Sequence, residues 1–287
     1  MIIVTGATGQ LGSRIVDRLL DRLPPERIGV SVRDTTKAAA LADRGVRVRQ
    51  GDYTDPASLA HALEGAGQVL LISSNSSGAD AVAHHRAAAD AARAAGARRI
   101  LYTSHQASAT DSLFGPMPDH ARTEQYLAQQ GGAFTSLRNG FYASTVGFLI
   151  GRALQTGVVT APADGPVSWT THDDLAEAAA VLLADEGRLD GITPPLTAPA
   201  THDLASVAAQ LSELTGRPIT REVVGDEEWK AGLVGHGVPE ARAEMMLGLF
   251  QAARRGEFDV TDPTLEKLLE RPAAPLRSFL AGVVEGG

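Results

Sequence analysis

The sequence contains no cysteine, only three lysines and no long hydrophobic run. The absence of cysteine excludes disulfides, thiolate zinc sites, iron–sulfur ligation and cysteine nucleophiles. No run approaches the roughly 18 apolar residues of a membrane-spanning helix, so the sequence predicts no membrane contact of that kind. The first residues read as a buried strand, without a basic segment or a cleavage site, so we expect no signal peptide. These features fit a cytoplasmic protein.

Acidic residues outnumber basic ones, and the formal net charge is −8 at pH 7. Nucleic acid and anionic membranes attract basic surfaces, so this charge disfavours both as partners. The sequence has no metal-binding spacing such as HExxH, so we expect no metal site. It also has no GxSxG nucleophile elbow. A chain of 287 residues is long enough for one large domain or two modest ones.

The first dozen residues, MIIVTGATGQLG, join an apolar strand to an amphipathic helix through a glycine-rich loop. The loop carries Gly6, Gly9 and Gly12 in the spacing GxxGxxG. Such glycines permit a tight turn, a close approach of a pyrophosphate to the backbone, and close packing of the helix. A glycine-rich turn that binds no ligand can have a similar sequence. The strand before this loop and the helix after it favour dinucleotide binding.

Strands and helices alternate through the first half of the chain. The hydrophobic pattern predicts strands near 28–32, 46–49, 69–72, 100–103 and 134–137, with helices between them. This alternation predicts an α/β fold, a doubly wound parallel Rossmann sheet with a smaller, mostly helical second lobe. We expect an NADP-binding domain over 1–150, completed by a strand near 167–171 and a helix over 172–184, and a smaller substrate-binding lobe over 151–287.

The residue that ends the second strand indicates which dinucleotide is bound. An acidic residue there binds the ribose hydroxyl of NAD, whereas an arginine accepts the 2′-phosphate of NADP. This strand ends at Arg33, and Lys37 follows on the next helix, so we favour NADPH. Asp34 comes directly after the arginine and makes the preference for NADPH less clear. The alternative is that Arg33 is a solvated charge at the end of a strand.

Polar residues also end the third and fourth strands. Ser73, Ser74 and Asn75 follow the fourth strand and suit the ribose and nicotinamide side of a cofactor, although a polar turn has the same composition. Asp52 follows the third strand, where it either accepts from the adenine amino group or caps a turn.

A proton donor for the reduced product is hard to find. A common device pairs Tyr with Lys four residues on, and none of the four tyrosines has that lysine. His120 is a candidate, because it is followed one helical turn later by Glu124 and histidine carries protons near neutral pH. An exposed His–Glu pair on a helix surface is at least as good an interpretation as a catalytic role.

The lack of a Tyr–Lys proton donor limits the classes of substrate that the protein could reduce. A ketone would give a strongly basic alkoxide, which needs a placed acid, whereas reduced quinones are weakly basic phenolates that water can protonate. The sequence therefore favours a quinone or a cationic dye-like acceptor over an ordinary ketone.

Several motifs, taken together and in this order, resemble one family. They are GATGQLG, VSVRD, RQGDYTDPASL, LLISSN, AARAAGARRILYTS, DHARTEQYL and LRNGFY, and they are densest from Met1 to Tyr142. They look like the NmrA-like atypical short-chain dehydrogenases, and more narrowly like bacterial type-2 NADPH:quinone oxidoreductases, to which triphenylmethane dye reductase is related.

This resemblance implies a set of site residues. The implied NADPH contacts are Gly6, Thr8, Gly9, Gln10, Leu11, Arg33, Ser73, Ser74 and Asn75. The implied lining of the nicotinamide and substrate pocket is Arg138, Asn139, Gly140, Phe141 and Tyr142, with Tyr142 a catalytic candidate beside His120. The family needs neither flavin nor metal. Asp34 departs from the family pattern, which usually has no acid next to the arginine.

The resemblance also keeps a second function open. NmrA-like proteins include regulators that bind a dinucleotide and then a protein partner without catalysing a reaction, although the sequence shows no partner-binding extension. An epimerase or a reductase of sugars or terpenoids is disfavoured by the missing Tyr–Lys pair. The oligomeric state is left open, with a homodimer among the options.

Overall fold

A computed structural model describes residues 1–286 and contains a seven-stranded, fully parallel central sheet. The order across the sheet is β10-β6-β5-β4-β1-β2-β3. The strands are β1 (Ile2–Thr5), β2 (Ile28–Val32), β3 (Arg47–Gln50), β4 (Gln68–Leu71), β5 (Arg99–His105), β6 (Ala133–Asn139) and β10 (Gly191–Ile192). The strand order runs outward in both directions from β1, which confirms the predicted doubly wound Rossmann fold.

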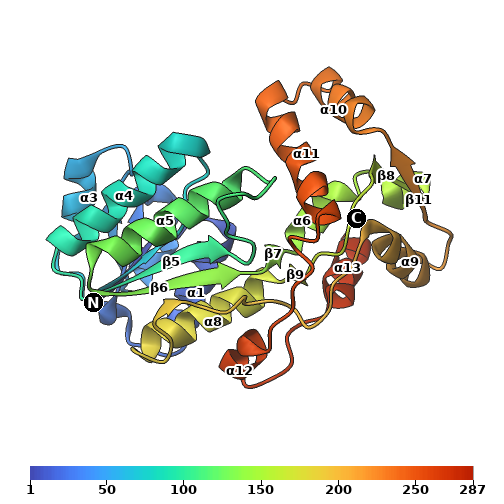
Figure 1. The fold of residues 1–287 in the computed structure, drawn as a ribbon. Coiled ribbons are helices and arrows are strands. Elements are labelled where there is room, and N and C mark those ends of the chain that lie inside the picture. Colours follow the sequence, from blue (N-terminus) through green and yellow to red (C-terminus); the bar gives the residue numbers. More distant parts are fainter. Residues whose placement is uncertain (287) are drawn as a thin grey trace.

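Helices cover both faces of this sheet (Figure 1). One face carries α1 (Gln10–Leu20) and α8 (His172–Ala184), and the other carries α3 (Pro56–Leu63), α4 (Gly78–Ala94) and α5 (Pro116–Gln130). The short elements η1 (Pro25–Arg27), η2 (Thr35–Ala38) and α2 (Ala39–Asp43) flank β2. Successive strand residues point to opposite faces, so Ile2 and Val4 pack in one hydrophobic cluster and Ile3 in the other.

The second lobe, on the right in Figure 1, is mostly helical and has its own apolar core around Trp169, Phe250 and Phe258. Its strands are β7 (Phe141–Tyr142), β8 (Val158–Pro162), β9 (Trp169–Thr170) and β11 (Thr220–Val224), which form two small sheets. Its helices are α6 (Ser144–Leu149), α7 (Ala153–Thr156), α9 (Leu204–Thr215), α10 (Asp226–Gly235), α11 (Glu240–Arg254) and α13 (Leu276–Glu285). A further helix, α12 (Thr264–Leu269), returns to pack against α8.

One predicted strand is in a different place. The strand expected near 167–171 to complete the central sheet is β9, and it pairs instead with β7 in the second lobe. The seventh strand of the central sheet is β10, which pairs with β6. The buried Arg99 explains this position, because its guanidinium donates to the carbonyls of Leu182 and Leu189 and so ties the segment before β10 to β5. The expected helix over 172–184 is present as α8 and packs along α1.

Between residues 1 and 286, no helix combines the length and the apolar composition needed to cross a membrane.

Candidate functional site

A cleft of about 1020 Å³, the main cleft, opens at the carboxyl edge of the sheet. The loops after β1, β2, β3 and β4 form its wall. The chain leaves β1 toward β2 on one side of the sheet, while β4 lies on the other side of β1. Parallel sheets bind ligands at this kind of switch point, because the diverging loops leave a crevice there.

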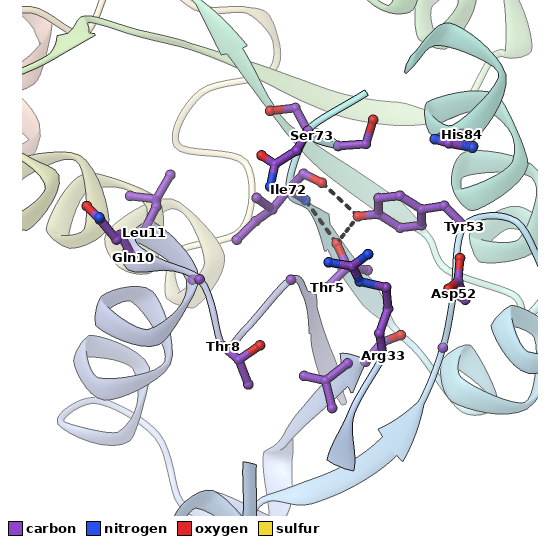
Figure 2. A pocket seen from close by; sticks show the side chains of 18 of the residues that line it. Thr5, Thr8, Gln10, Leu11, Arg33, Asp52, Tyr53, Ile72, Ser73 and His84 are labelled. Carbon is purple, nitrogen blue, oxygen red and sulfur yellow. Dashed lines mark hydrogen bonds between the residues drawn. The ribbon is translucent and has the colours of Figure 1, made fainter. Parts of the chain in front are cut away.

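The glycine loop forms one wall of the main cleft (Figure 2). Gly6 turns the chain off β1 with a φ of +60°, and its carbonyl accepts from the amide of Gly9 at 3.0 Å. Helix α1 then begins without a side-chain cap and without an acid in its first turn. Its first amides and the positive end of its dipole are therefore available to a phosphate. This cradle fits the pyrophosphate of a dinucleotide.

Gly12 should tolerate a side chain worse than Gly9 does. A Cβ on Gly12 would lie 2.3 Å from the carbonyl oxygen of Gly6, whereas one on Gly9 would lie 3.3 Å from that atom. Gly12→Ala should push the loop away from α1, lower stability by about 1–3 kcal/mol and weaken dinucleotide binding. Thermal unfolding and a binding titration of both variants test this. Equal behaviour of Gly9→Ala and Gly12→Ala would contradict it.

Arg33 lies on the main cleft at the end of β2, facing the glycine loop (Figure 2). Its side chain is exposed and makes no ion pair within residues 1–286. Asp34, which blurred the sequence signal, caps the next turn: its Oδ1 accepts from the amide and the hydroxyl of Thr36 at 3.0 and 2.6 Å. These bonds hold the pKa of Asp34 below its usual value. Lys37 lies on the same wall, so two cations remain for a phosphate.

A half-buried tyrosine forms the floor between β1 and β4. The hydroxyl of Tyr53 donates to the carbonyl of Ile72 at 2.7 Å and also contacts the hydroxyl of Thr5 (Figure 2). Burial raises the pKa of Tyr53, so this phenol stays neutral. Asp52, beside it, accepts from the amide and hydroxyl of Thr54 and thus caps a turn while lining the cleft. No pattern in the sequence had assigned Tyr53 to the site.

Two aromatic rings close another part of the wall. Tyr142, from β7, packs against His172 at the start of α8, with ring centroids 4.3 Å apart and the ring planes tilted by 31°. Burial lowers the pKa of His172 to about 4, so the ring is neutral near pH 7. His172 was missed from the sequence, because its contact with Tyr142 joins segments that are distant along the chain.

The main cleft brings together most of the residues expected to bind the cofactor. Those on its wall are Gly6, Thr8, Gly9, Gln10, Leu11, Arg33, Ser73, Ser74, Asn75 and Tyr142. The other four expected pocket residues, Arg138, Asn139, Gly140 and Phe141, are not on this wall. Glu124 holds the guanidinium of Arg138, and Phe141 packs edge-on against Trp169.

Asn139 and Gly140 have structural reasons to lie away from the cleft. Asn139 is only 2% exposed at the end of β6. A Cβ on Gly140 would lie 2.1 Å from the hydroxyl oxygen of Thr170, so this residue allows β7 to approach β9 closely. The roles of these residues toward a ligand stay predictions.

His120 and Glu124 do not pair with each other. Glu124 is 2% exposed and binds Arg138, with Nη2 to Oε2 at 2.7 Å. His120 instead shares a hydrogen bond of 2.7 Å with the hydroxyl of Tyr102 through its Nδ1. The exposed His–Glu pair considered from the sequence is therefore wrong, and His120 belongs to a different set of contacts.

The fold and the main cleft define a Rossmann-type α/β protein with a dinucleotide-binding loop. The chain belongs to the NmrA-like family, which matches residues 1–277. It is 36% identical over 277 residues to quinone oxidoreductase 2 of Escherichia coli, covering 96% of each chain.

Two solved structures are similar over nearly their whole length. One is the NADPH-dependent quinone oxidoreductase of Escherichia coli complexed with NADPH, with a TM-score of 0.92, 34% identity and 99% of each chain covered. The other is the triphenylmethane reductase of Citrobacter sp. complexed with NADP(H), with a TM-score of 0.89 and 33% identity, covering 99% of this chain and all of the other.

Proposed function

We propose that this protein is an oxidoreductase that uses NADPH to reduce a quinone-type acceptor bound between the two lobes. Arg33 carries the proposal, because it leaves a free guanidinium opposite a glycine loop that fits a pyrophosphate. The similarity to a quinone oxidoreductase solved with NADPH supports both the cofactor and the acceptor class. Bound NADPH supplies the hydride.

The two lobes divide this work. We propose that residues 1–150 together with α8 hold the cofactor, and that the lobe over 151–287 supplies the acceptor side. Ser73, Ser74 and Asn75, after β4, face the ribose and the nicotinamide in this proposal. Tyr142 and His120 stand nearest the reacting groups, Tyr142 on the main cleft and His120 on a recess that adjoins it.

Quinones suit this site better than ketones. The chain has no Tyr–Lys pair, and the pKa values of the half-buried Tyr53 and Tyr142 are raised, which makes them poor acids. A reduced quinone leaves as a weakly basic phenolate that water protonates, so the protein needs to stabilise charge but not to supply a proton. We further propose that neither flavin nor metal takes part, and that the enzyme works in the cytoplasm.

The first test mixes the purified protein with NADPH and a small benzoquinone and follows the loss of reduced-cofactor absorbance. We expect turnover that persists after dialysis against a chelator and without added flavin. A blank without protein corrects for direct reaction of quinone with NADPH. Absence of turnover across several quinones and triphenylmethane dyes would contradict the proposal and would favour a regulator that binds the dinucleotide only. Sedimentation of the same sample tests the homodimer, which stays a prediction.

A further inference from the structure

A chain of hydrogen bonds runs from the cofactor loop after β4 to His120. The amide of Ser74 donates to Nε2 of His85 at 2.9 Å. Nδ1 of His85 lies 2.9 Å from the hydroxyl oxygen of Thr123 and 3.3 Å from that of Tyr102. The hydroxyl of Tyr102 in turn lies 2.7 Å from Nδ1 of His120.

The direction of every bond in this chain follows from the first one. A backbone amide can only donate, so Nε2 of His85 accepts, and the ring carries its proton on Nδ1. Thr123 gives its own proton to the carbonyl of Asp119 and accepts from His85. Tyr102 cannot donate to a protonated Nδ1 of His85, so its proton goes to Nδ1 of His120. His120 therefore carries its proton on Nε2.

The other nitrogen of His120 is free. Within residues 1–286, Nε2 of His120 makes no hydrogen bond, and it is not among the buried polar atoms that lack a partner. His120 lines a recess of about 30 Å³ together with Ser73, Ser74 and Ser76, and these three serines also line the main cleft. A volume of this size holds roughly one small polar group, such as a water or a carbonyl oxygen.

The charged and titratable groups around His120 leave it neutral. Glu124, on the same helix, is neutralised by Arg138. Asp119 is held by the amide of Gly78 and by Arg122. His85 and His105, whose rings stack near that of His120, are neutral because burial lowers the pKa of each.

Burial also lowers the pKa of His120, to about 4, and Glu124 opposes this shift only in part. A neutral imidazole is a hydrogen-bond donor and a very poor acid, because losing its proton would leave an imidazolate.

We propose that His85 and Tyr102 are positioning residues that hold His120 as a neutral Nε2–H donor toward one oxygen of the bound quinone. The proposal rests on the proposed function for its acceptor. The quinone gains two electrons with the hydride, the negative charge collects on the oxygen that His120 contacts, and water then supplies the proton. His120 keeps its own proton throughout, as a fixed donor that stabilises developing charge. This replaces the sequence-based view of His120 as a proton carrier.

The tautomer can be tested without any substrate. Long-range ¹H–¹⁵N correlation spectra of the imidazole nitrogens, with His120 assigned by comparison with His120→Gln, should show the proton on Nε2 and no charging above about pH 5. Tyr102→Phe removes the donor to Nδ1 and should give a mixture of tautomers. His85→Ala should do the same, because it removes the group that sets the direction of the Tyr102 bond. A proton on Nδ1, or a doubly protonated ring at pH 7, in the wild type would overturn the proposal.

Kinetics with benzoquinone test the role in the reaction. Tyr102→Phe should lower kcat about tenfold and leave the KM for NADPH unchanged, because the variant alters charge stabilisation and not cofactor binding. Tyr126→Phe is the matched control, since Tyr126 lies on the same helix as His120 and its hydroxyl donates to the exposed Asp90. An unchanged kcat in Tyr102→Phe would overturn the proposal. Absence of turnover in the wild type would instead refute the proposed function, while the spectra still decide the tautomer.

Discussion

Replacing Arg33 by Ala is expected to weaken NADPH binding by roughly 10- to 100-fold while changing NADH binding by less than about threefold. The guanidinium lies on the main cleft without an ion-pair partner in the described part of the chain, so it is free to bind the 2′-phosphate that only NADPH carries. A charge-assisted, bidentate contact with phosphate is stronger than a neutral hydrogen bond. The measurement is a titration of each cofactor against wild type and variant.

The control for this prediction is Arg44→Ala. Arg44 is also a basic residue near β2 and β3, but its partner is the exposed Asp17, and such surface pairs contribute little. We expect it to leave both affinities unchanged. Equal weakening of NADPH and NADH by Arg33→Ala would show that Arg33 supports the cleft generally and does not select the phosphate.

Asp34 shows why this part of the site was ambiguous in the sequence. An acid next to Arg33 could bind a ribose hydroxyl and so favour NADH. The structure shows that its Oδ1 is occupied by Thr36, two residues on, where it caps a turn. Aspartates that cap turns in this way are common in loops, so the sequence alone does not show whether Asp34 binds a ribose or caps a turn.

Local signals predicted most of the fold. The helix over 172–184 begins and ends where expected, and Thr171 caps its first turn by accepting from the amide of Asp174. The two-residue strand β10 was missed, since Gly191–Ile192 is too short to show an alternating pattern. Its place in the sheet depends on Arg99, which is distant along the chain.

In the candidate site, too, residues that follow a predicted strand could be placed from the sequence, and contacts between distant segments could not. The glycine loop and Arg33 directly follow predicted strands, so the sequence placed them at one edge of the sheet. The partners of His120 and Glu124 could not be found in that way. Spacing on a helix put these two side chains on one face, but Tyr102 on β5 and Arg138 on β6 compete for them in the folded chain. Helical spacing shows which residues are neighbours, and tertiary packing decides which of them bond.

Replacing Glu124 by Gln should lower the free energy of unfolding by about 3 kcal/mol, because it leaves the Arg138 guanidinium without its counter-charge in a largely buried position. The carboxylate also accepts from Ser104 on β5 and from Ser136 on β6, so it joins the ends of two neighbouring strands. We expect a smaller loss than for a fully buried pair, since the side chain of Arg138 is 27% exposed. Urea denaturation at pH 7 measures the change.

The pH dependence of the stability of Glu124→Gln distinguishes the contribution of the Glu124 charge from that of side-chain packing. Burial acts to raise the pKa of Glu124, but hydrogen bonds from Arg138, Ser104 and Ser136 outweigh it and hold the pKa below its usual 4.5. A carboxyl whose pKa is depressed by folding contributes stability that is complete above the unfolded pKa and is lost as pH falls through the folded one. The difference between wild type and Glu124→Gln should therefore be largest near pH 7 and shrink below about pH 4.5.

Glu64→Gln provides the comparison for this experiment. Glu64 also accepts from an arginine, Arg49, at 2.8 Å, but its side chain is 70% exposed, so water replaces the lost contact. We expect a change in stability close to the error of the measurement at every pH. If Glu124→Gln behaved like Glu64→Gln, the Glu124–Arg138 pair would not be what holds the ends of β5 and β6 together. The serines and the backbone pairing of the two strands would then have to supply that stability.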